Sequence, residues 1–182
     1  TKHWTKLIRC MFKQIVDGVA FMHSKNICCY DVSLENMTLL NDLSIAVGED
    51  DKITFTNIDR EVQVKLVDYG LAEKFKPNAD QTQTQRVFPS AKFCGKTNYQ
   101  SPEIVEKRVF DAAANDVWCC GVSLFMMAGG YQPWRVAKKS EASFEAIMNG
   151  QMKRVLHSYG VSRYFDADLV DLLQSILQRE SK

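Results

Sequence analysis

The sequence has no excess of either charge and no long apolar run. Its 23 lysines and arginines are balanced by 22 aspartates and glutamates, a formal net charge of +1 over 182 residues, which argues against a nucleic-acid partner. No apolar run approaches the roughly 18 residues that a membrane span needs, and the N-terminal residues lack the pattern of a signal peptide. We therefore expect no membrane partner and an intracellular, cytoplasmic location.

The cysteines lack the spacing of a metal site or of a secreted disulfide framework. No C-x-x-C pair occurs among the six, which are Cys10, Cys28, Cys29, Cys94, Cys119 and Cys120. We expect reduced thiols that are mostly buried as small apolar groups. With 46% apolar residues the chain is long enough for one sizeable core, so a single globular domain is the default prediction.

The sequence does contain four short motifs in a fixed order. An aspartate and an asparagine five residues apart, Asp31 and Asn36, are on their own ordinary turn chemistry, but three further motifs follow them. These are Asp68-Tyr69-Gly70 after a strand-like run, Ser101-Pro102-Glu103 after a polar irregular segment, and Asp116-Val117-Trp118 at the start of an apolar helix. Ordinary turn chemistry does not explain four motifs in this order.

Together these motifs resemble the C-terminal lobe of a eukaryotic protein kinase. Cys29-Tyr30-Asp31 to Asn36 matches the catalytic loop H-R-D-L-x-x-x-N, and the next two motifs match D-F-G and A-P-E. The resemblance covers residues 1–182 and implies an α+β fold, mostly α, with a small β-hairpin region. It also implies ATP and Mg²⁺ as cofactors and a protein substrate.

Apolar periodicity predicts the elements of this lobe. Helices are expected at 5–23, with Thr5 as N-cap, and at 111–127, 143–148 and 168–177; strands are expected at 37–40, 52–56 and 62–67. The family places a tight hairpin between Asn36 and Asp68, so the 31 intervening residues imply an insertion at about 41–61. Its acidic turn at 48–51 is either a docking site for a basic partner or a solvated loop.

The resemblance assigns roles to individual residues. Asp31 is the expected catalytic base, and Asn36 and Asp68 are the expected Mg²⁺ ligands that hold the ATP phosphates. Glu35 and Thr38 complete the predicted cofactor-binding set. Thr38 falls where the family has an apolar residue beneath the adenine, and Glu35 is also placed to meet a basic residue of a peptide substrate. Asp116 is expected to accept hydrogen bonds from the loop.

Two substitutions suggest that a catalytic charge has moved. Ser33 stands where many serine/threonine kinases carry a lysine that contacts the transferring phosphate, and Lys96, after Gly95, stands where they carry a threonine. We expect Lys96 to reach the space beside Ser33 and to do the work of the missing lysine. Ser33 and Lys96 therefore join Asp31 as predicted catalytic residues.

Other departures concern regulation. Cys29 and Tyr30 replace the histidine and arginine of the loop, and Lys92 replaces the usual phosphorylated residue. Because the arginine of the family normally pairs with that phosphate, we expect an activation segment that is not switched by it. Thr82, Thr84 and Ser90 remain available for modification.

The nine glycines contain no G-x-G-x-x-G, and no V-A-I-K-like strand precedes the catalytic loop. We therefore expect an N-lobe, or the rest of a kinase domain, as a partner and an inactive isolated chain, which also ends before the arginine that the family pairs with Glu103. The alternative is a pseudokinase or interaction scaffold that keeps the fold and has lost catalysis.

Overall fold

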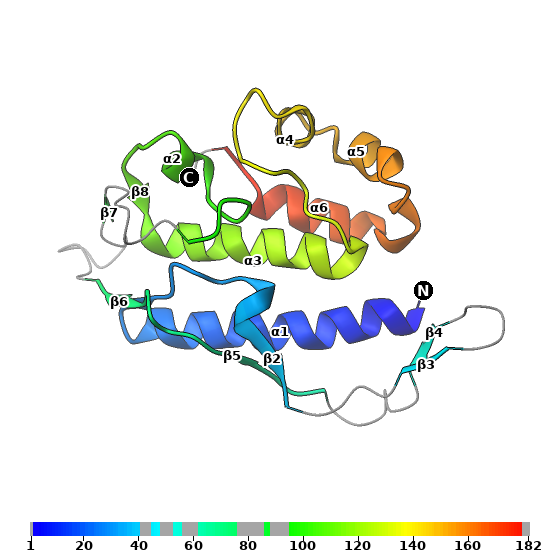
Figure 1. Cartoon of the computed structure of the whole chain (residues 1–182), viewed down its shortest axis with the longest axis horizontal. Coiled ribbons are helices and arrows are strands. Elements are labelled where there is room, and N and C mark those ends of the chain that lie inside the picture. Colours follow the sequence, from blue (N-terminus) through cyan, green and yellow to red (C-terminus); the bar gives the residue numbers. More distant parts are fainter. Residues whose placement is uncertain are drawn as a thin grey trace.

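The structure, a computed structural model, describes residues 2–40, 45–47, 53–55, 62–75, 86–87 and 95–179. Two long helices, α1 (Lys2–Ser24) and α3 (Ala112–Gly129), run antiparallel to each other through the middle of the molecule (Figure 1). On α1 the apolar side chains recur every three or four residues, and Ile8, Ile15 and Val19 are buried in the core cluster that also contains side chains of α3.

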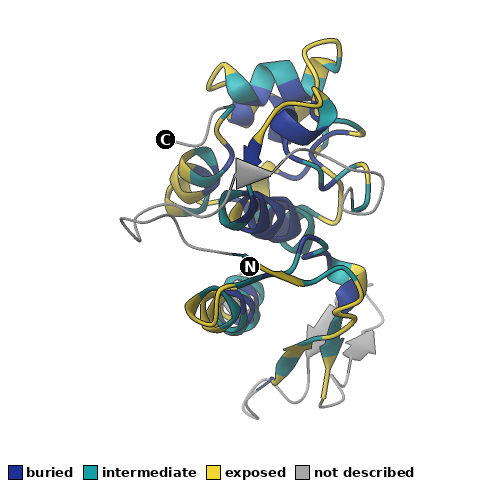
Figure 2. Cartoon of the chain, turned by 90° about the vertical axis from the view of Figure 1, so that its left-hand side faces the viewer, coloured by how far each residue is buried: buried dark blue, intermediate teal, exposed yellow. Residues whose placement is uncertain are grey.

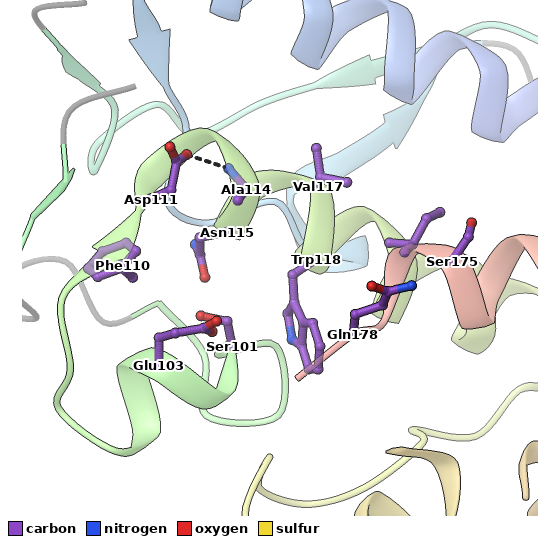
Figure 3. Close-up of a pocket in the computed structure, with 11 residues that line it drawn as sticks. Ser101, Glu103, Phe110, Asp111, Ala114, Asn115, Val117, Trp118, Ser175 and Gln178 are labelled. Atoms are coloured by element: carbon purple, nitrogen blue, oxygen red, sulfur yellow. Dashed lines mark hydrogen bonds between the residues drawn. The ribbon is translucent and has the colours of Figure 1, made fainter. Parts of the chain in front are cut away.

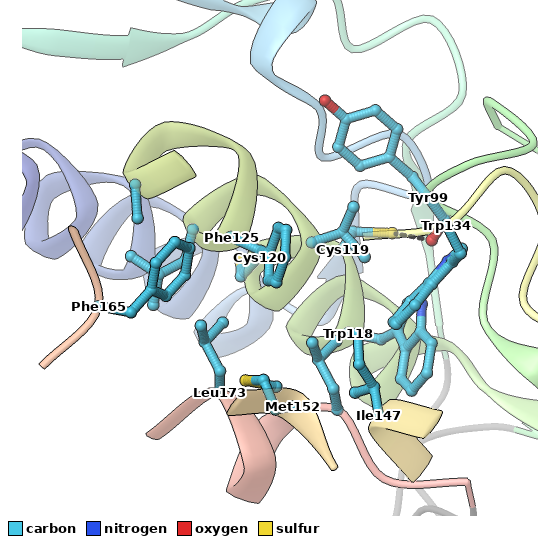
Figure 4. Packing of buried hydrophobic residues seen from close by; sticks show 14 of the residues in the cluster. Tyr99, Trp118, Cys119, Cys120, Phe125, Trp134, Ile147, Met152, Phe165 and Leu173 are labelled. Atoms are coloured by element: carbon cyan, nitrogen blue, oxygen red, sulfur yellow. Dashed lines mark hydrogen bonds between the residues drawn. The ribbon is translucent and has the colours of Figure 1, made fainter. Parts of the chain in front are cut away.

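Helix α3 is apolar around nearly its whole circumference because other helices pack against it from two opposite directions. The helix α1 lies on one side, and α4 (Ala142–Met148), α5 (Met152–Ser158) and α6 (Ala167–Ile176) lie on the other (Figure 1). Aromatic rings fill the space between these helices, and Trp118 packs on Trp134 with ring centroids 5.4 Å apart (Figure 4). In Figure 2 the central helix α3 is mostly dark blue, the colour of buried residues.

The ends of α3 follow from its sequence. Asp111 is its N-cap, because the side chain accepts a hydrogen bond of 2.8 Å from the amide of Ala114. Gly130 ends the helix in the left-handed conformation with φ 74°, which costs a glycine little. The predicted helix at 111–127 and its glycine stop are confirmed.

The other predicted helices are confirmed, with different bounds. Thr5 as N-cap is wrong, because α1 begins one turn earlier at Lys2. The Trp4 indole donates to the carbonyl of Ala128 at 3.2 Å, which fastens this extra turn to the end of α3. Two helices were missed: α5, and the short α2 (Pro102–Val105). Met152, Val155 and Leu156, which α5 buries, carry its helical spacing.

Among the described residues, the strands form four antiparallel pairs and not one sheet. The predicted hairpin is β2 (Met37–Leu39) with β5 (Val64–Leu66), and β3 (Ile45–Val47) pairs with β4 (Ile53–Phe55) inside the expected insertion. The pairs β1 (Ile27–Cys28) with β6 (Glu73–Lys74) and β7 (Arg86–Val87) with β8 (Phe110–Asp111) were not predicted.

The predicted fold class, α+β and mostly α, is confirmed by these elements. The acidic turn at 48–51 and residues Thr82, Thr84, Ser90, Lys92 and Cys94 lie outside the described residues. The other five cysteines are free thiols, as expected. Within the described chain, no helix has both the length and the apolar character to cross a membrane.

Candidate active site

The loop after β1 is held by a buried carboxylate at the start of α3. Asp116 has no exposed surface, and its two oxygens accept hydrogen bonds of 2.8 Å from the amide of Cys29 and 2.9 Å from the amide of Tyr30. His23, at the end of α1, lies 2.9 Å from the same carboxylate. The expected role of Asp116 is confirmed, and His23 has a structural contact.

His23, Cys28 and Asp116 also form the one group in the described chain whose ligand atoms lie close enough to hold a metal, within 4.8 Å of one another. Both Asp116 oxygens are already occupied by loop amides. Burial, followed by the charge of Asp116, raises the pKa of the Cys28 thiol and keeps it protonated. The group is therefore a hydrogen-bonded core.

Asp31 lies at the centre of the predicted catalytic residues. The Asn36 amide donates to the Asp31 carboxylate at 2.8 Å and to its carbonyl at 2.9 Å. From the opposite segment, the Lys96 ammonium lies 3.2 Å from the same carboxylate and donates to Ser33 Oγ at 2.8 Å. The structure thus brings together all three predicted catalytic residues and one predicted ligand.

Gly95 allows this approach. It has φ 53°, and a Cβ at this position would lie 2.9 Å from the carbonyl oxygen of Tyr30. Any other residue would be strained in its backbone and would push the segment away from the loop. The glycine therefore places Lys96 against the catalytic loop.

Asn36 and Asp68 are neighbours through the backbone. The amide of Val67 donates to the carbonyl of Asn36 at 2.8 Å, which sets Asp68, with φ 60°, beside the loop. Asp68 is exposed, and one of its oxygens accepts from the amide of Gly70 at 3.2 Å. No hydrogen bond joins the Asn36 and Asp68 side chains in the described structure.

The oxygens of these two side chains fit a hard cation such as Mg²⁺, which takes carboxylate and amide oxygen ligands. The Asn36 amide nitrogen is committed to Asp31, so its side-chain oxygen is turned the other way and makes no bond to a described residue. The Asp68 carboxylate keeps its second oxygen unbonded among the described residues.

Glu35 and Thr38 lie at the edge of this cluster. Glu35 is exposed and accepts a hydrogen bond of 3.2 Å from the hydroxyl of Tyr99, which itself accepts from the amide of Leu34 at 3.1 Å. Thr38 lies on β2 opposite Lys65 and is half-buried. Tyr99 was missed by sequence reasoning, although an aromatic residue within a polar segment just before Ser101 was a signal of a buried anchor.

Tyr30 occupies the position where the family carries an arginine, and its side chain belongs to an apolar cluster. Its ring is buried and meets Phe110 edge to face, with centroids 6.2 Å apart. Cys28, Ile104 and Ala112 complete the buried cluster, and burial raises the pKa of Tyr30 to about 12.

A cavity of about 480 Å³ lies behind α2, between Glu103 and the start of α3 (Figure 3). The buried atoms Ser101 Oγ, Asn115 Oδ1 and Trp118 Nε1 have no hydrogen-bond partner among the described residues. The Glu103 carboxylate makes no ion pair with any described residue. An arginine is the partner that the resemblance implies for Glu103.

A helical lobe that presents an aspartate and an asparagine on a loop held by a buried carboxylate is the arrangement that the resemblance predicted for a kinase. The family model described as the protein kinase domain matches residues 3–182. The chain therefore belongs to the protein kinase family.

Curated relatives agree with this assignment. The chain is 27% identical over 173 residues to CBL-interacting serine/threonine-protein kinase 12 of Arabidopsis thaliana, which covers 95% of the chain and 29% of that protein. It is 28% identical over 171 residues to the human SNF-related serine/threonine-protein kinase, covering 94% of the chain and 18% of that protein. The chain thus spans less than a third of the length of these relatives.

Proposed function

We propose that the chain is the C-terminal lobe of a serine/threonine protein kinase, which transfers the γ-phosphoryl group of ATP to a hydroxyl of a protein substrate. The observation that carries the proposal is the contact of Asp31 with both Asn36 and Lys96. A carboxylate, an amide and a cation are gathered at one point, and phosphoryl transfer depends mainly on such positioning and on charge stabilisation.

In this proposal Asp31 orients the substrate hydroxyl and accepts its proton as the oxygen attacks the γ-phosphorus. The bond from that phosphorus to the bridging oxygen of the ADP leaving group breaks as the new bond forms. Lys96 stabilises the negative charge on the transferring group, and Ser33 fixes the ammonium through their hydrogen bond. Mg²⁺, held by Asn36 and Asp68, would neutralise the phosphate charge.

The remaining predicted roles belong to the same proposal. Thr38 would lie beneath the adenine of bound ATP, and Glu35 would contact the nucleotide or a basic residue of the substrate. The segment at about 41–61 is an insertion in the hairpin region. The ATP site is completed by an N-lobe, so the isolated chain does not turn over.

A pseudokinase or interaction scaffold is the alternative, and it is favoured by Cys29, Tyr30 and Ser33 at the histidine, arginine and lysine positions of the family. Against it, Asp31, Asn36 and Asp68 are all present. The Asp31 carboxylate also keeps its hydrogen bond to Asn36 despite the changed neighbours.

The proposal is tested in the full-length protein with radiolabelled ATP, Mg²⁺ and a degenerate serine/threonine peptide library. We expect phosphate transfer that Asp31→Asn reduces at least a hundredfold, while Asp171→Asn, on the exposed surface of α6, leaves it unchanged. Transfer no greater than that of the Asp31→Asn protein would support the pseudokinase alternative.

A further inference from the structure

We propose that a groove at the N-terminal end of α1 binds an acidic segment of a partner protein that inserts one large apolar side chain. The groove consists of two adjoining hollows between α1 and α6, which share Thr5, Arg9, Tyr164 and Asp166. Arg9 precedes His23, at the catalytic end of α1, by 14 helical residues, which is roughly 20 Å along the helix at 1.5 Å per residue. The groove is therefore separate from the active site, and the proposal does not rest on catalysis.

The first hollow is apolar and has the size of a side chain. Its volume is about 250 Å³, and its lining includes the buried Ile8 and Leu124 and the half-buried Phe12. Leu172, on its α6 side, is 42% exposed. Pockets for whole drug-sized ligands run from about 300 to 1,000 Å³, so this hollow suits one apolar anchor of a larger partner.

The second hollow is cationic. It has a volume of about 530 Å³, and its charged lining residues are three cations, Lys6, Arg9 and Arg163, and one acid, Asp166. None of the three cations makes an ion pair with a described residue. Arg163 stacks on the ring of Tyr164, 4.8 Å from its centroid, and donates to its hydroxyl at 2.9 Å. This guanidinium is partly oriented before binding, which lowers the entropy lost when it meets an anion.

The charged residues that line the two hollows determine which end of the groove receives the acidic residues of the partner. Asp168 lines only the apolar hollow, whereas Asp166 lines both hollows and caps α6 by accepting from the amide of Leu169 at 2.9 Å. Asp168 repels acidic residues of the partner at the apolar end, so they belong beside Lys6 and Arg163, which line only the second hollow. A nucleic acid would bring phosphates but no aliphatic group for the exposed Leu172, so a peptide fits both hollows better.

Fluorescence anisotropy with the 182-residue chain tests the proposal. The probes are labelled 12-residue peptides rich in glutamate, each with leucines three or four residues apart so that a helix presents them on one face. We expect micromolar binding that weakens at least tenfold with Arg9→Glu and at least tenfold with Leu172→Gln. Lys153→Glu, an equal charge change at an exposed position of α5, should leave the affinity unchanged.

Three outcomes would overturn the proposal. The first is equal loss of binding with Lys153→Glu, which would show general charge attraction. The second is equal binding of peptides in which lysine replaces glutamate. The third is the absence of millimolar or tighter binding by any peptide, and in that case sedimentation showing self-association through Leu172 would identify a second copy of the chain as the occupant.

Discussion

The ammonium group of Lys96 donates a hydrogen bond of 2.8 Å to the hydroxyl of Ser33 while lying 3.2 Å from the carboxylate of Asp31. Ser33 is fully buried, and the Lys96 side chain is 35% exposed, so the cation reaches into the loop from the solvent side. A positive charge is thus present beside the proposed base, although the catalytic loop itself carries none there. We interpret this pair as one catalytic charge moved to another segment.

The Asp116 carboxylate gives the first prediction. Asp116→Asn replaces an oxygen that accepts from a loop amide with a second donor, and this leaves a buried amide without a partner. An unmade buried hydrogen bond costs about 1–3 kcal/mol, so urea denaturation should show a loss of unfolding free energy of that size. The matched change Asp171→Asn on exposed α6 should have almost no effect, and equal stability of the two variants would refute the account of the loop.

The apolar cluster at Tyr30 predicts insensitivity to phosphatase. Because Tyr30 packs on Phe110 where an arginine would receive a phosphate, dephosphorylation of the full-length enzyme should change its rate by less than about twofold. A tenfold loss would show that Thr82, Thr84 or Ser90 carries an ordering phosphate.

The packing of Tyr30 in this apolar cluster should also contribute to the free energy of unfolding. Tyr30→Ala removes a buried ring and should cost about 3 kcal/mol of unfolding free energy, as large-to-small core changes do. Tyr30→Phe keeps the ring and should cost much less. Similar losses in both variants would mean that the hydroxyl, not the packing, matters.

Three buried thiols and the half-buried Cys29 predict a loss of stability at high pH. Burial raises the pKa of Cys29 and of Cys120 to about 12, from 9.0, and raises those of Cys28 and Cys119 also. Above pH 9 the unfolded chain releases these protons and the folded chain keeps them, so the stabilisation is complete below pH 9 and is lost as the pH rises toward 12. Each thiol contributes about 1.4 kcal/mol per pH unit in that range.

Urea denaturation at pH 8 and pH 10, with reductant, measures this slope. Cys120→Ala removes one ionisable group and should make the total loss between pH 8 and pH 10 smaller by about 1.4 kcal/mol, because the thiol of the unfolded chain ionises only from about pH 9. An identical slope in the variant would show that Cys120 ionises equally in both states.

The helices were predictable because their apolar spacing is determined by the core that they share. The pattern of Leu7, Ile8 and Ile15 defines one face of α1, and the nearly continuous apolar run of α3 indicates a helix covered on both sides. The start of α1 was not predictable from local signals, because the contact of Trp4 with Ala128 joins residues 124 positions apart. The two-residue strands β6 and β7 depend likewise on partners distant in sequence.

In the candidate active site, too, some residues could be predicted from the sequence and others could not. Motif order identified Asp31, Asn36 and Asp68, and the exchange of residue types at Ser33 and Lys96 raised the expectation that they are close in space. An aromatic residue before Ser101 indicated a buried anchor, but no pattern indicated that Tyr99 links Leu34 to Glu35. Nor did it indicate that Tyr30 faces Phe110, because a buried tyrosine and an exposed one look the same in a polar loop.

The most direct test of the account is a double-mutant cycle on Lys96 and Ser33 in the full-length protein, with kcat measured for each variant. A charge-assisted contact contributes about 1.5–3 kcal/mol, so Lys96→Thr, like Lys96→Met, should lower kcat roughly ten- to hundredfold if the contact is made mainly in the transition state. Adding Ser33→Lys to Lys96→Thr should restore part of that loss. Independent, additive losses from the two changes would contradict a shared charge and favour a pseudokinase.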